Sequence, residues 1–327
     1  MGYIPPFDLT EEMMQLVSEI SELIGSIRNA NELERFPRLR RAGRIRSIHS
    51  SLAIENNTLT LGQVTDIING KRVLGPPDEI LEVKNAADAY RELENIDPTD
   101  MKDMLRVHRI MMNGLADECG KLRTVNVGVF TGSGKVVHAA PQPAMVPQLM
   151  KDLFNWLKGS KAHELIRSSV FHYEFEFIHP FCDGNGRMGR LWQTAILMIW
   201  RPLFAWIPTE STIRKHQQEY YNAISRSTKA GRSNDFIIFM LKATLDAVKE
   251  IVSEAHDHMN HINARVNRLL NIMGSRALSA AELMEHLNLR SRKALYDNYL
   301  RPAMEAGLVE MTDPDRPTSR NQMYVKK

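Results

Sequence analysis

The stretch His179-Pro180-Phe181-Cys182-Asp183-Gly184-Asn185-Gly186-Arg187-Met188-Gly189-Arg190 decides how this chain is interpreted. Two glycines within three residues, Gly184 and Gly186, allow positive φ angles and a close approach of the backbone to a bound group. If a helix begins near Gly186, its free N–H groups point into the loop, and such a loop is an anion site. The residue types therefore predict a loop that binds an anion.

The charged side chains of this stretch narrow the chemistry. Arg187 and Arg190 are three residues apart and share one side of a helical turn, which suits a polyphosphate. Asp183 supplies a hard oxygen of the kind that Mg²⁺ requires when it bridges phosphates. His179 could take a proton from a hydroxyl group near neutral pH. Each piece alone would be an ordinary loop or helix residue, but together they predict attack of a hydroxyl on a nucleotide phosphorus.

The stretch resembles the signature of the Fic family, H-P-F-x-[D/E]-G-N-G-R-x-x-R, at every fixed position. The resemblance extends over roughly residues 40 to 250 and implies an enzyme, a protein adenylyltransferase, that transfers AMP from ATP to a Ser, Thr or Tyr hydroxyl of a target protein. It implies that His179 is the base and that Asp183 holds Mg²⁺. The residues that it implies for phosphate binding are Gly184, Asn185, Gly186, Arg187 and Arg190.

The resemblance also implies a flap and an adenine pocket. The hairpin expected over 127–138 lies where the family has its flap, and Val129, Phe130 and Thr131 begin it. Such a flap aligns an extended segment of the target by adding a strand. Tyr220 and Tyr221 resemble the segment that helps to form the adenine pocket.

A second motif, Ser51-Leu52-Ala53-Ile54-Glu55-Asn56, matches the inhibitory pattern [S/T]-x-x-x-E-[G/N] of the family. A carboxylate at the C-terminal end of a helix is unfavourable on dipole grounds, and two arginines in an anion pocket would be a reason for it. By resemblance Ser51, Glu55 and Asn56 are regulatory, and Glu55 pairs with Arg190 and displaces the γ-phosphate. The alternative is an ordinary surface carboxylate. In some relatives the same glutamate positions a water that removes AMP, so removal of AMP is an alternative activity.

The periodicity of apolar residues predicts a mostly α chain with one β-hairpin. The expected hairpin has strands at Val125–Phe130 and Lys135–His138. We expect three parts: an N-terminal helical region with the inhibitory helix, a Fic catalytic core, and a C-terminal winged-helix domain, at residues 1–85, 86–255 and 262–327. The expected helices lie at 10–68 with an interruption, 80–96, 101–117, 146–157 and 162–178.

The last part has the pattern of a winged helix. Helices are expected over 264–272, from the capping box at Ser279, and over 292–306, followed by strands at 308–311 and 322–325. From Ile262 onward there are 11 lysines and arginines against 7 aspartates and glutamates. The basic residues Arg290, Arg292 and Lys293 at the start of a recognition helix can contact DNA, but Asp297 and Glu305 oppose phosphate binding and favour a protein-docking or purely structural domain instead. A nucleotide-sensing, DNA-binding regulator is an alternative function.

Composition sets the remaining expectations. The chain has 327 residues, of which 43% are hydrophobic and 25% are charged, as in ordinary globular proteins. Its two cysteines cannot form a disulfide scaffold, and we see no signal peptide, so a cytoplasmic protein is expected. The apolar stretch 191–208 is broken by Gln193 and Arg201 and predicts a buried helix, not a membrane span. The partners that we consider are a target protein on the flap, the chain itself as AMP acceptor, and a homo-oligomer.

Overall fold

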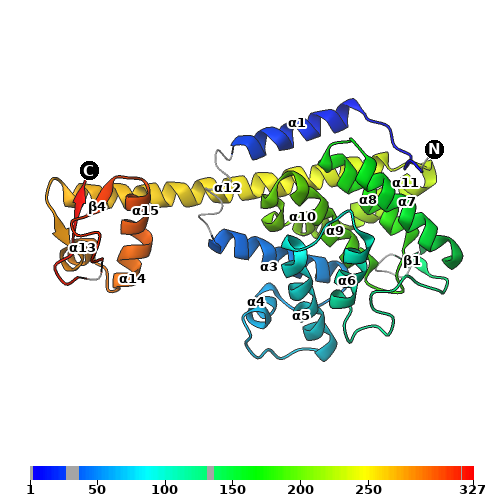
Figure 1. The fold of residues 1–327 in the computed structure, drawn as a ribbon, viewed down its shortest axis with the longest axis horizontal. Helices are drawn as coiled ribbons and strands as arrows, with labels where there is room; N and C mark the ends of the chain where they lie inside the picture. Colours follow the sequence, from blue (N-terminus) through cyan, green and yellow to red (C-terminus); the bar gives the residue numbers. More distant parts are fainter. Residues whose placement is uncertain (1–2, 27–36, 131–135, 318) are drawn as a thin grey trace. The chain divides into compact units, whose positions relative to one another are not determined.

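The computed structural model describes residues 3–26, 37–130, 136–317 and 319–327. The chain divides into two compact units, Met1–Ile251 and Val252–Lys327. Helices make up most of both units, with one hairpin in the first and a three-stranded sheet in the second (Figure 1). The predicted fold class, mostly α with a hairpin and a C-terminal winged helix, is confirmed.

The helices of the first third begin and end where the sequence supplies caps. Thr60 and Gln63 form a capping box, and Asp100 accepts a hydrogen bond from the Lys102 N–H. Asn56 has a φ of 72°, which ends the preceding helix at the expected place. The elements are α1 (Glu11–Ser26), α3 (Pro37–Ile54), α4 (Leu61–Ile68), α5 (Pro77–Arg91), the short η1 (Glu92–Glu94) and α6 (Met101–Met111).

The predicted hairpin is present but shorter than expected. Strand β1 (Gly128–Phe130) pairs in antiparallel fashion with β2 (Val136–Ala139), and the turn 131–135 lies outside the described residues. The expected strand from Val125 was wrong in its start, because the Val125 carbonyl accepts a hydrogen bond from the Arg123 side chain. This interaction replaces the ladder bond that a longer strand would need.

Two helices form the centre of the first unit. Helices α8 (Glu164–Ile178) and α9 (Asn185–Trp200) are buried on almost every side, and the other helices of this unit pack around them (Figure 1). The predicted buried helix at 191–208 ends at Trp200, because the Arg201-Pro202 step begins a new turn. The surrounding elements are η2 (Pro143–Met145), α7 (Val146–Gly159), η3 (Pro202–Trp206), α10 (Thr209–Lys215) and α11 (Gln217–Ala230).

Buried polar groups connect these helices in fixed positions. His172 of α8 donates through Nδ1 to Gln193 Oε1 (2.5 Å) and accepts through Nε2 from the Tyr220 hydroxyl (3.1 Å). Burial lowers the pKa of His172 to about 3, so the ring is neutral at pH 7. Glu210 accepts from Ser47 Oγ (2.8 Å) and the Tyr90 hydroxyl (2.9 Å), which joins α10 to α3 and α5.

The second unit begins within α12 (Asn234–Met273), a single helix that includes the residues 264–272 for which a separate helix was predicted. The unit continues with β3 (Leu278–Ser279), α13 (Ala280–Leu287), α14 (Arg292–Leu295), a π-turn (Tyr296–Leu300), α15 (Arg301–Glu305), β4 (Val309–Met311) and β5 (Met323–Lys326). The three strands form one antiparallel sheet in the order β3-β5-β4.

Two details of this unit differ from the sequence-based expectation. Strand β3 was not predicted, because its two residues overlap the Ser279 capping box and carry no alternating pattern. The helix expected over 292–306 contains a π-turn in which the Arg301 N–H donates to the Tyr296 carbonyl. Pro302 follows directly, and its missing N–H explains why regular α-helix is interrupted there.

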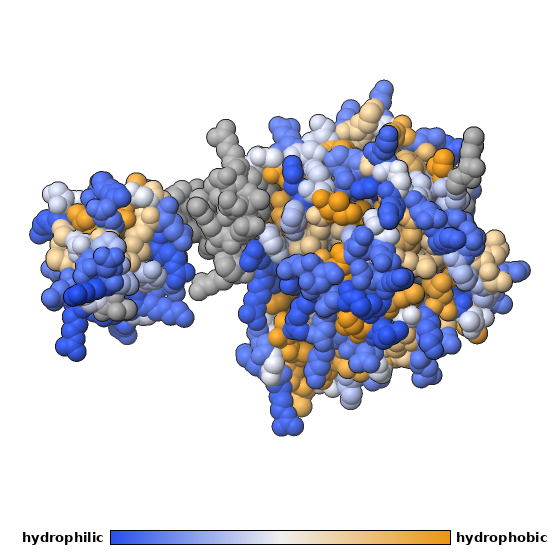
Figure 2. All heavy atoms as spheres, viewed as in Figure 1, coloured by the Kyte–Doolittle hydropathy of each residue, from blue (hydrophilic) through white to orange (hydrophobic). Residues whose placement is uncertain are grey.

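The surface is mixed in character. On the face drawn in Figure 2, hydrophilic residues (blue) cover much of both units, and hydrophobic residues (orange) reach the surface in smaller groups. No helix among the described residues has the length and apolar character needed to cross a bilayer.

Helix α3 lies so close to η3 that one added methyl group would not fit. A Cβ atom built on Gly43 would be 2.0 Å from the Trp206 carbonyl oxygen, which is backbone and cannot rotate away. We expect Gly43→Ala to lower the free energy of unfolding by about 1–3 kcal/mol. Gly25→Ala in α1 is the control, because a Cβ there meets nothing within 4 Å. Urea denaturation of both variants checks this, and equal stabilities would contradict the close α3–η3 contact.

Candidate active site

The proposed base, His179, lies at the end of α8 in a left-handed conformation (φ 50°, ψ 61°). Its N–H donates to the Phe175 carbonyl (2.9 Å), and its own carbonyl accepts from Arg123 Nε (2.7 Å). A positive φ is unfavourable for a residue with a Cβ, so the surrounding contacts must hold it. The chain thereby turns from α8 into the loop that leads to α9.

Arg123 is the main support of this turn and was not predicted from the sequence. Its side chain is 2% exposed and donates to the carbonyls of His179, Val125 (2.9 Å) and Pro141 (2.6 Å). Burial lowers the pKa of Arg123. Because Val125 and Pro141 flank the hairpin, this one guanidinium fixes the loop and the base of the flap together. A single arginine outside any motif gives no signal in the sequence.

The loop itself is held by a stacked pair of rings. The Phe181 ring is fully buried and stacks on His108 with ring centroids 3.6 Å apart. His108 Nδ1 accepts from the Gly120 N–H (2.8 Å), so Nε2 carries the proton that it donates to the Asp183 carbonyl (3.0 Å). Burial lowers the pKa of His108 to about 4, which keeps the ring in this neutral form at pH 7.

Asn185 closes the loop at the start of α9. Its side chain accepts from the Phe181 N–H and donates to the Phe181 carbonyl, both at 2.9 Å. Gly184 precedes the helix with a φ of 81°, and α9 begins at Asn185, one residue before the predicted start. The N–H groups of the first helical turn have no intrahelical partners, so they are available to an anion, as the sequence predicts.

A carboxylate of the chain itself lies at this anion site. Glu55 Oε1 accepts from the Arg190 guanidinium at 2.7 Å. A Cβ atom on Gly186, in the first turn of α9, would be 2.3 Å from the same oxygen. Glu55 therefore occupies the positive end of α9, and the absence of a side chain at residue 186 makes room for it.

Arg190 is almost fully buried, with 2% of its surface exposed. Its guanidinium also donates to Ser51 Oγ and to the Ser51 carbonyl, both at 3.0 Å. Burial alone would lower its pKa, but the neighbouring Glu55 carboxylate raises the pKa of Arg190 above its ordinary value. Asn56 follows Glu55 in the left-handed conformation, so the three motif residues lie together at the end of α3.

The other arginine of the loop, Arg187, has different partners. Its guanidinium contacts Asp183 Oδ1 and Glu82 Oε1, both at 3.0 Å, and it does not line the cavity described below. Asp183 remains 60% exposed in its side chain and also accepts from the Gly184 N–H. Glu82, on α5, had no motif and was not predicted.

Nine of the predicted site residues line a cavity of about 200 Å³, whereas Ser51, Asn56 and Arg187 do not. Val129 and Phe130 lie on β1, opposite His138 and Val136, while Thr131 is outside the described residues. Tyr221 is half-buried, and Tyr220 is buried with its hydroxyl on His172. The residues that line the cavity are Glu55, Gly128, Glu176, His179, Cys182, Asp183, Gly184, Asn185, Gly186, Arg190, Tyr220, Tyr221 and Ile224.

Among the described residues, no group of three or more His, Cys, Asp and Glu side chains could hold a metal ion. The single exposed carboxylate of Asp183 nevertheless fits Mg²⁺, which is commonly held by one or two carboxylates together with substrate phosphates. A metal held in this way requires the nucleotide as its other ligand.

Glu176 is a further buried acid that the sequence did not indicate. Its carboxyl oxygens lie 3.8 Å from His179 Nδ1 and 3.8 Å from His172 Nε2. Burial, partly offset by Arg190, raises the pKa of Glu176 to about 8, so this group is mainly protonated at pH 7. The cavity beside His179 therefore contains two carboxyl groups, Glu55 and Glu176, in different environments.

Two family models match the chain. Residues 98–197 match the Fic/DOC family, and residues 264–325 match the C-terminal domain described as filamentation induced by cAMP protein Fic-like. The protein adenylyltransferase Fic of Aedes aegypti is 26% identical over 250 residues, which are 72% of this chain and 47% of that protein. Protein adenylyltransferase fic-1 of Caenorhabditis elegans is 26% identical over 58% of this chain and 38% of its own length. The chain thus spans less than half of the length of these two curated relatives.

A solved structure is similar over the whole chain. The crystal structure of a Fic family protein from Desulfovibrio desulfuricans G20 is 47% identical, with a TM-score of 0.76, and the match covers 99% of this chain and 98% of that one. The identity and the coverage of both chains are high enough to show common family membership, and the loop motif and the fold point to the same family. The chain belongs to the Fic family.

Proposed function

We propose that this chain is a protein adenylyltransferase that transfers AMP from ATP to a Ser, Thr or Tyr hydroxyl of a target protein. One observation carries the proposal: His179, Asp183, the first turn of α9 and Arg190 converge on one cavity. The relatives from Aedes aegypti and Caenorhabditis elegans are both named protein adenylyltransferases, which supports the same activity. The three proposed parts of the chain are the regulatory region 1–85, the catalytic core 86–255 and the winged-helix domain 262–327.

In this mechanism His179 removes the proton of the target hydroxyl. The hydroxyl oxygen forms a bond to the α-phosphorus, the bond from that phosphorus to the bridging β-phosphate oxygen breaks, and pyrophosphate leaves. The hydroxyl proton passes to the His179 imidazole. Glu176 lies beside Nδ1 of the His179 ring and can orient the ring so that Nε2 takes the proton.

The α9 end of the cavity would hold the phosphates. The free N–H groups from Asn185 and Gly186 point toward an anion there, and Arg190 adds a positive charge. Arg187 would add a second positive charge beside this turn, with its guanidinium held by Asp183 and Glu82. Mg²⁺, bound by Asp183 and the phosphates, would neutralise charge that develops on the leaving group.

The nucleoside and the target would contact the other sides of the cavity. Tyr221 is the better placed of the two tyrosines for contact with adenine, since the Tyr220 hydroxyl is already bound to His172. The flap would present an extended segment of the target by strand addition along β1. We also propose that the chain can transfer AMP to itself, that it forms a homo-oligomer and that it is located in the cytoplasm.

Glu55 would act as a brake within the chain. Its carboxylate lies at the positive end of α9 and on Arg190, where a phosphate of ATP would bind. Two anions cannot share that place without strong repulsion. Removal of AMP by a water that Glu55 positions remains the alternative chemistry of this site. A nucleotide-sensing, DNA-binding regulator is the other alternative. The basic residues Arg290, Arg292 and Lys293, at and just before the start of α14, are exposed and would be available to DNA.

His179→Ala should reduce AMP transfer by about 10²–10⁴-fold while ATP affinity stays within about twofold, because the imidazole acts on the hydroxyl proton and not on the phosphates. Transfer of label from α-³²P-ATP to protein measures the first quantity and calorimetry the second. His286→Ala, an exposed histidine of α13, is the control. Transfer at the wild-type rate in the His179 variant would remove this residue from the mechanism.

Asp183→Asn should weaken ATP binding in the presence of Mg²⁺ by roughly tenfold or more, since the metal ligand is lost while the shape is kept. In wild type, a chelator should produce a similar loss of affinity, and in the variant it should add little. Titration of ATP at fixed Mg²⁺ concentrations measures this. A wild-type protein that is indifferent to the chelator would exclude Asp183 as a metal ligand.

Glu55→Gly should raise AMP transfer, including self-modification, by roughly tenfold or more. The variant removes an anion from the place that the phosphate needs and leaves Arg190 free to bind it. Without ATP the variant should melt at a lower temperature, because the buried guanidinium has lost its carboxylate, and ATP should restore the melting temperature by mass action.

Two further variants separate charge from shape in this experiment. Glu55→Gln keeps the size of the side chain but not its charge, and it should activate at least partly. Arg190→Ala added to Glu55→Gly should cancel the gain. If Glu55→Gly transfers no more AMP than wild type to itself or to several test proteins, Glu55 is not a brake.

A further inference from the structure

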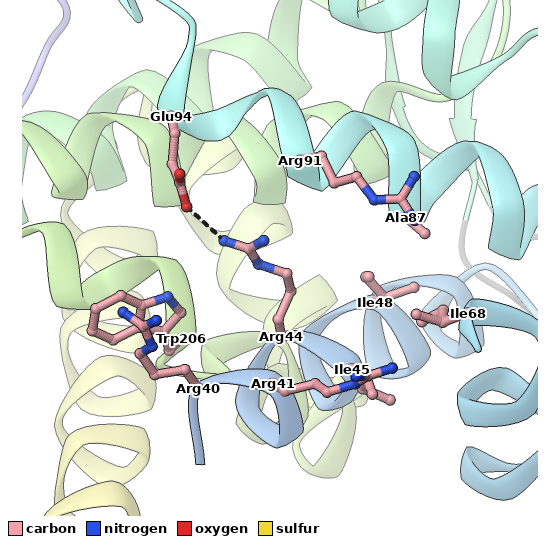
Figure 3. A pocket seen from close by; sticks show the side chains of 10 residues that line it. All are labelled: Arg40, Arg41, Arg44, Ile45, Ile48, Ile68, Ala87, Arg91, Glu94 and Trp206. Carbon is pink, nitrogen blue, oxygen red and sulfur yellow. Dashed lines mark hydrogen bonds and ion pairs between the residues drawn. The ribbon is translucent and has the colours of Figure 1, made fainter. Parts of the chain in front are cut away.

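A second cavity lies away from the candidate active site, and no residue lines both. It has a volume of about 460 Å³ and is formed by α3, the end of α4, α5, η1 and η3 (Figure 3). Four arginines line it, Arg40, Arg41 and Arg44 from α3 and Arg91 from α5, against one acid, Glu94. The rest of the lining is mostly isoleucine side chains and the Trp206 ring. We call this cavity the arginine pocket.

The arginines are concentrated where a helix least favours them. The first ten residues of α3, Pro37 to Arg46, include five arginines and no acid. The N-terminal end of a helix carries a partial positive charge, so arginines in its first turns are destabilising. Arg40 and Arg44 are four residues apart and lie on one face, where they also repel each other. A bound anion would offset both effects.

The contacts within the protein neutralise only part of this charge. Arg44 pairs with Glu94 at 3.1 Å, and Arg91 pairs with Asp88, but the acids are 65% and 55% exposed. Ion pairs with such exposed partners contribute little to the free energy of folding, because water screens the attraction between the charges. Arg41 contacts a neutral amide, that of Asn69.

Within the described part of the chain, Arg40 has no acid among its contacts. Its guanidinium carbon lies 4.8 Å from the centre of the Trp206 ring, and Figure 3 shows the two groups stacked on one side of the hollow. A cation over an aromatic ring keeps its full positive charge. The arginine pocket therefore has two guanidinium groups, those of Arg40 and Arg41, that have no carboxylate partner among residues 37–130 and the other described ranges.

We propose that the arginine pocket binds a small ligand that contains a diphosphate group. Planar guanidinium forks match phosphate oxygens, and four of them around one hollow suit two linked phosphates better than one. The volume falls within the range of small-ligand sites, roughly 300–1,000 Å³. The diphosphate can belong to inorganic pyrophosphate or to a nucleoside diphosphate, whose base would contact Trp206. The site does not depend on whether the chain transfers AMP.

Calorimetric titration of the full chain with inorganic pyrophosphate, without Mg²⁺, tests the proposal. Because the first turn of α9 also attracts phosphate, the number of equivalents is the decisive quantity. The double variant Arg41→Gln/Arg44→Gln should bind one equivalent fewer than wild type. Arg226→Gln is the control for loss of a partly exposed, ion-paired arginine such as Arg44, because Arg226 pairs with Glu219 on α11 and does not line the pocket. This control should bind as wild type does.

Arg91→Gln keeps the test valid if the double variant fails to fold, since its side chain is 59% exposed and its loss should not disturb packing. It should weaken pyrophosphate binding at this site by roughly tenfold. Tighter binding of ADP than of pyrophosphate would assign a nucleotide, and equal binding would assign the diphosphate alone. The proposal is overturned if wild type and the variants bind the same equivalents with the same affinity, or if binding is weaker than about 1 mM.

Discussion

A guanidinium group that is almost fully buried must have an anion or several acceptors beside it, and Arg190 is such a group. It is met by Glu55 and by two acceptors of Ser51, all from the end of α3. This requirement fixes where α3 must lie against α9. It also means that any phosphate bound at the first turn of α9 meets a site whose charge is already balanced, which is the physical basis of the proposed brake.

Helix α3 is held firmly enough to place that carboxylate. Gly43 allows it to lie against the backbone of Trp206, and Ser47 donates to the buried Glu210 of α10. The same helix carries the arginine pocket at its start and the Glu55 motif at its end. Helix α3 therefore carries both the carboxylate of Glu55, which binds Arg190, and the arginines that we propose bind an external diphosphate.

The loop 179–190 is preorganised by residues outside its motif. Arg123 holds the carbonyl of His179, and His108 stacks on Phe181 while donating to the Asp183 carbonyl. Both supports depend on burial, which keeps His108 neutral and places Arg123 among carbonyl groups. A site that is fixed in this way needs little rearrangement when charge develops in a transition state.

The sequence by itself determined the helical class, the loop 179–190, the Glu55 motif and the winged-helix pattern, because these depend on local spacing and on contiguous residue types. Only the tertiary structure decided that Arg187 contacts Glu82 and Asp183, that Arg123 supports His179, and that four arginines face one hollow. The contacts of Arg187 with Glu82 and of Arg123 with His179, and the approach of Arg91 to the arginines of α3, join residues that are far apart in the chain, and neither periodicity nor motif encodes such distances. Which arginine meets which acid depends on how the helices pack, because burial makes an unpaired charge unfavourable.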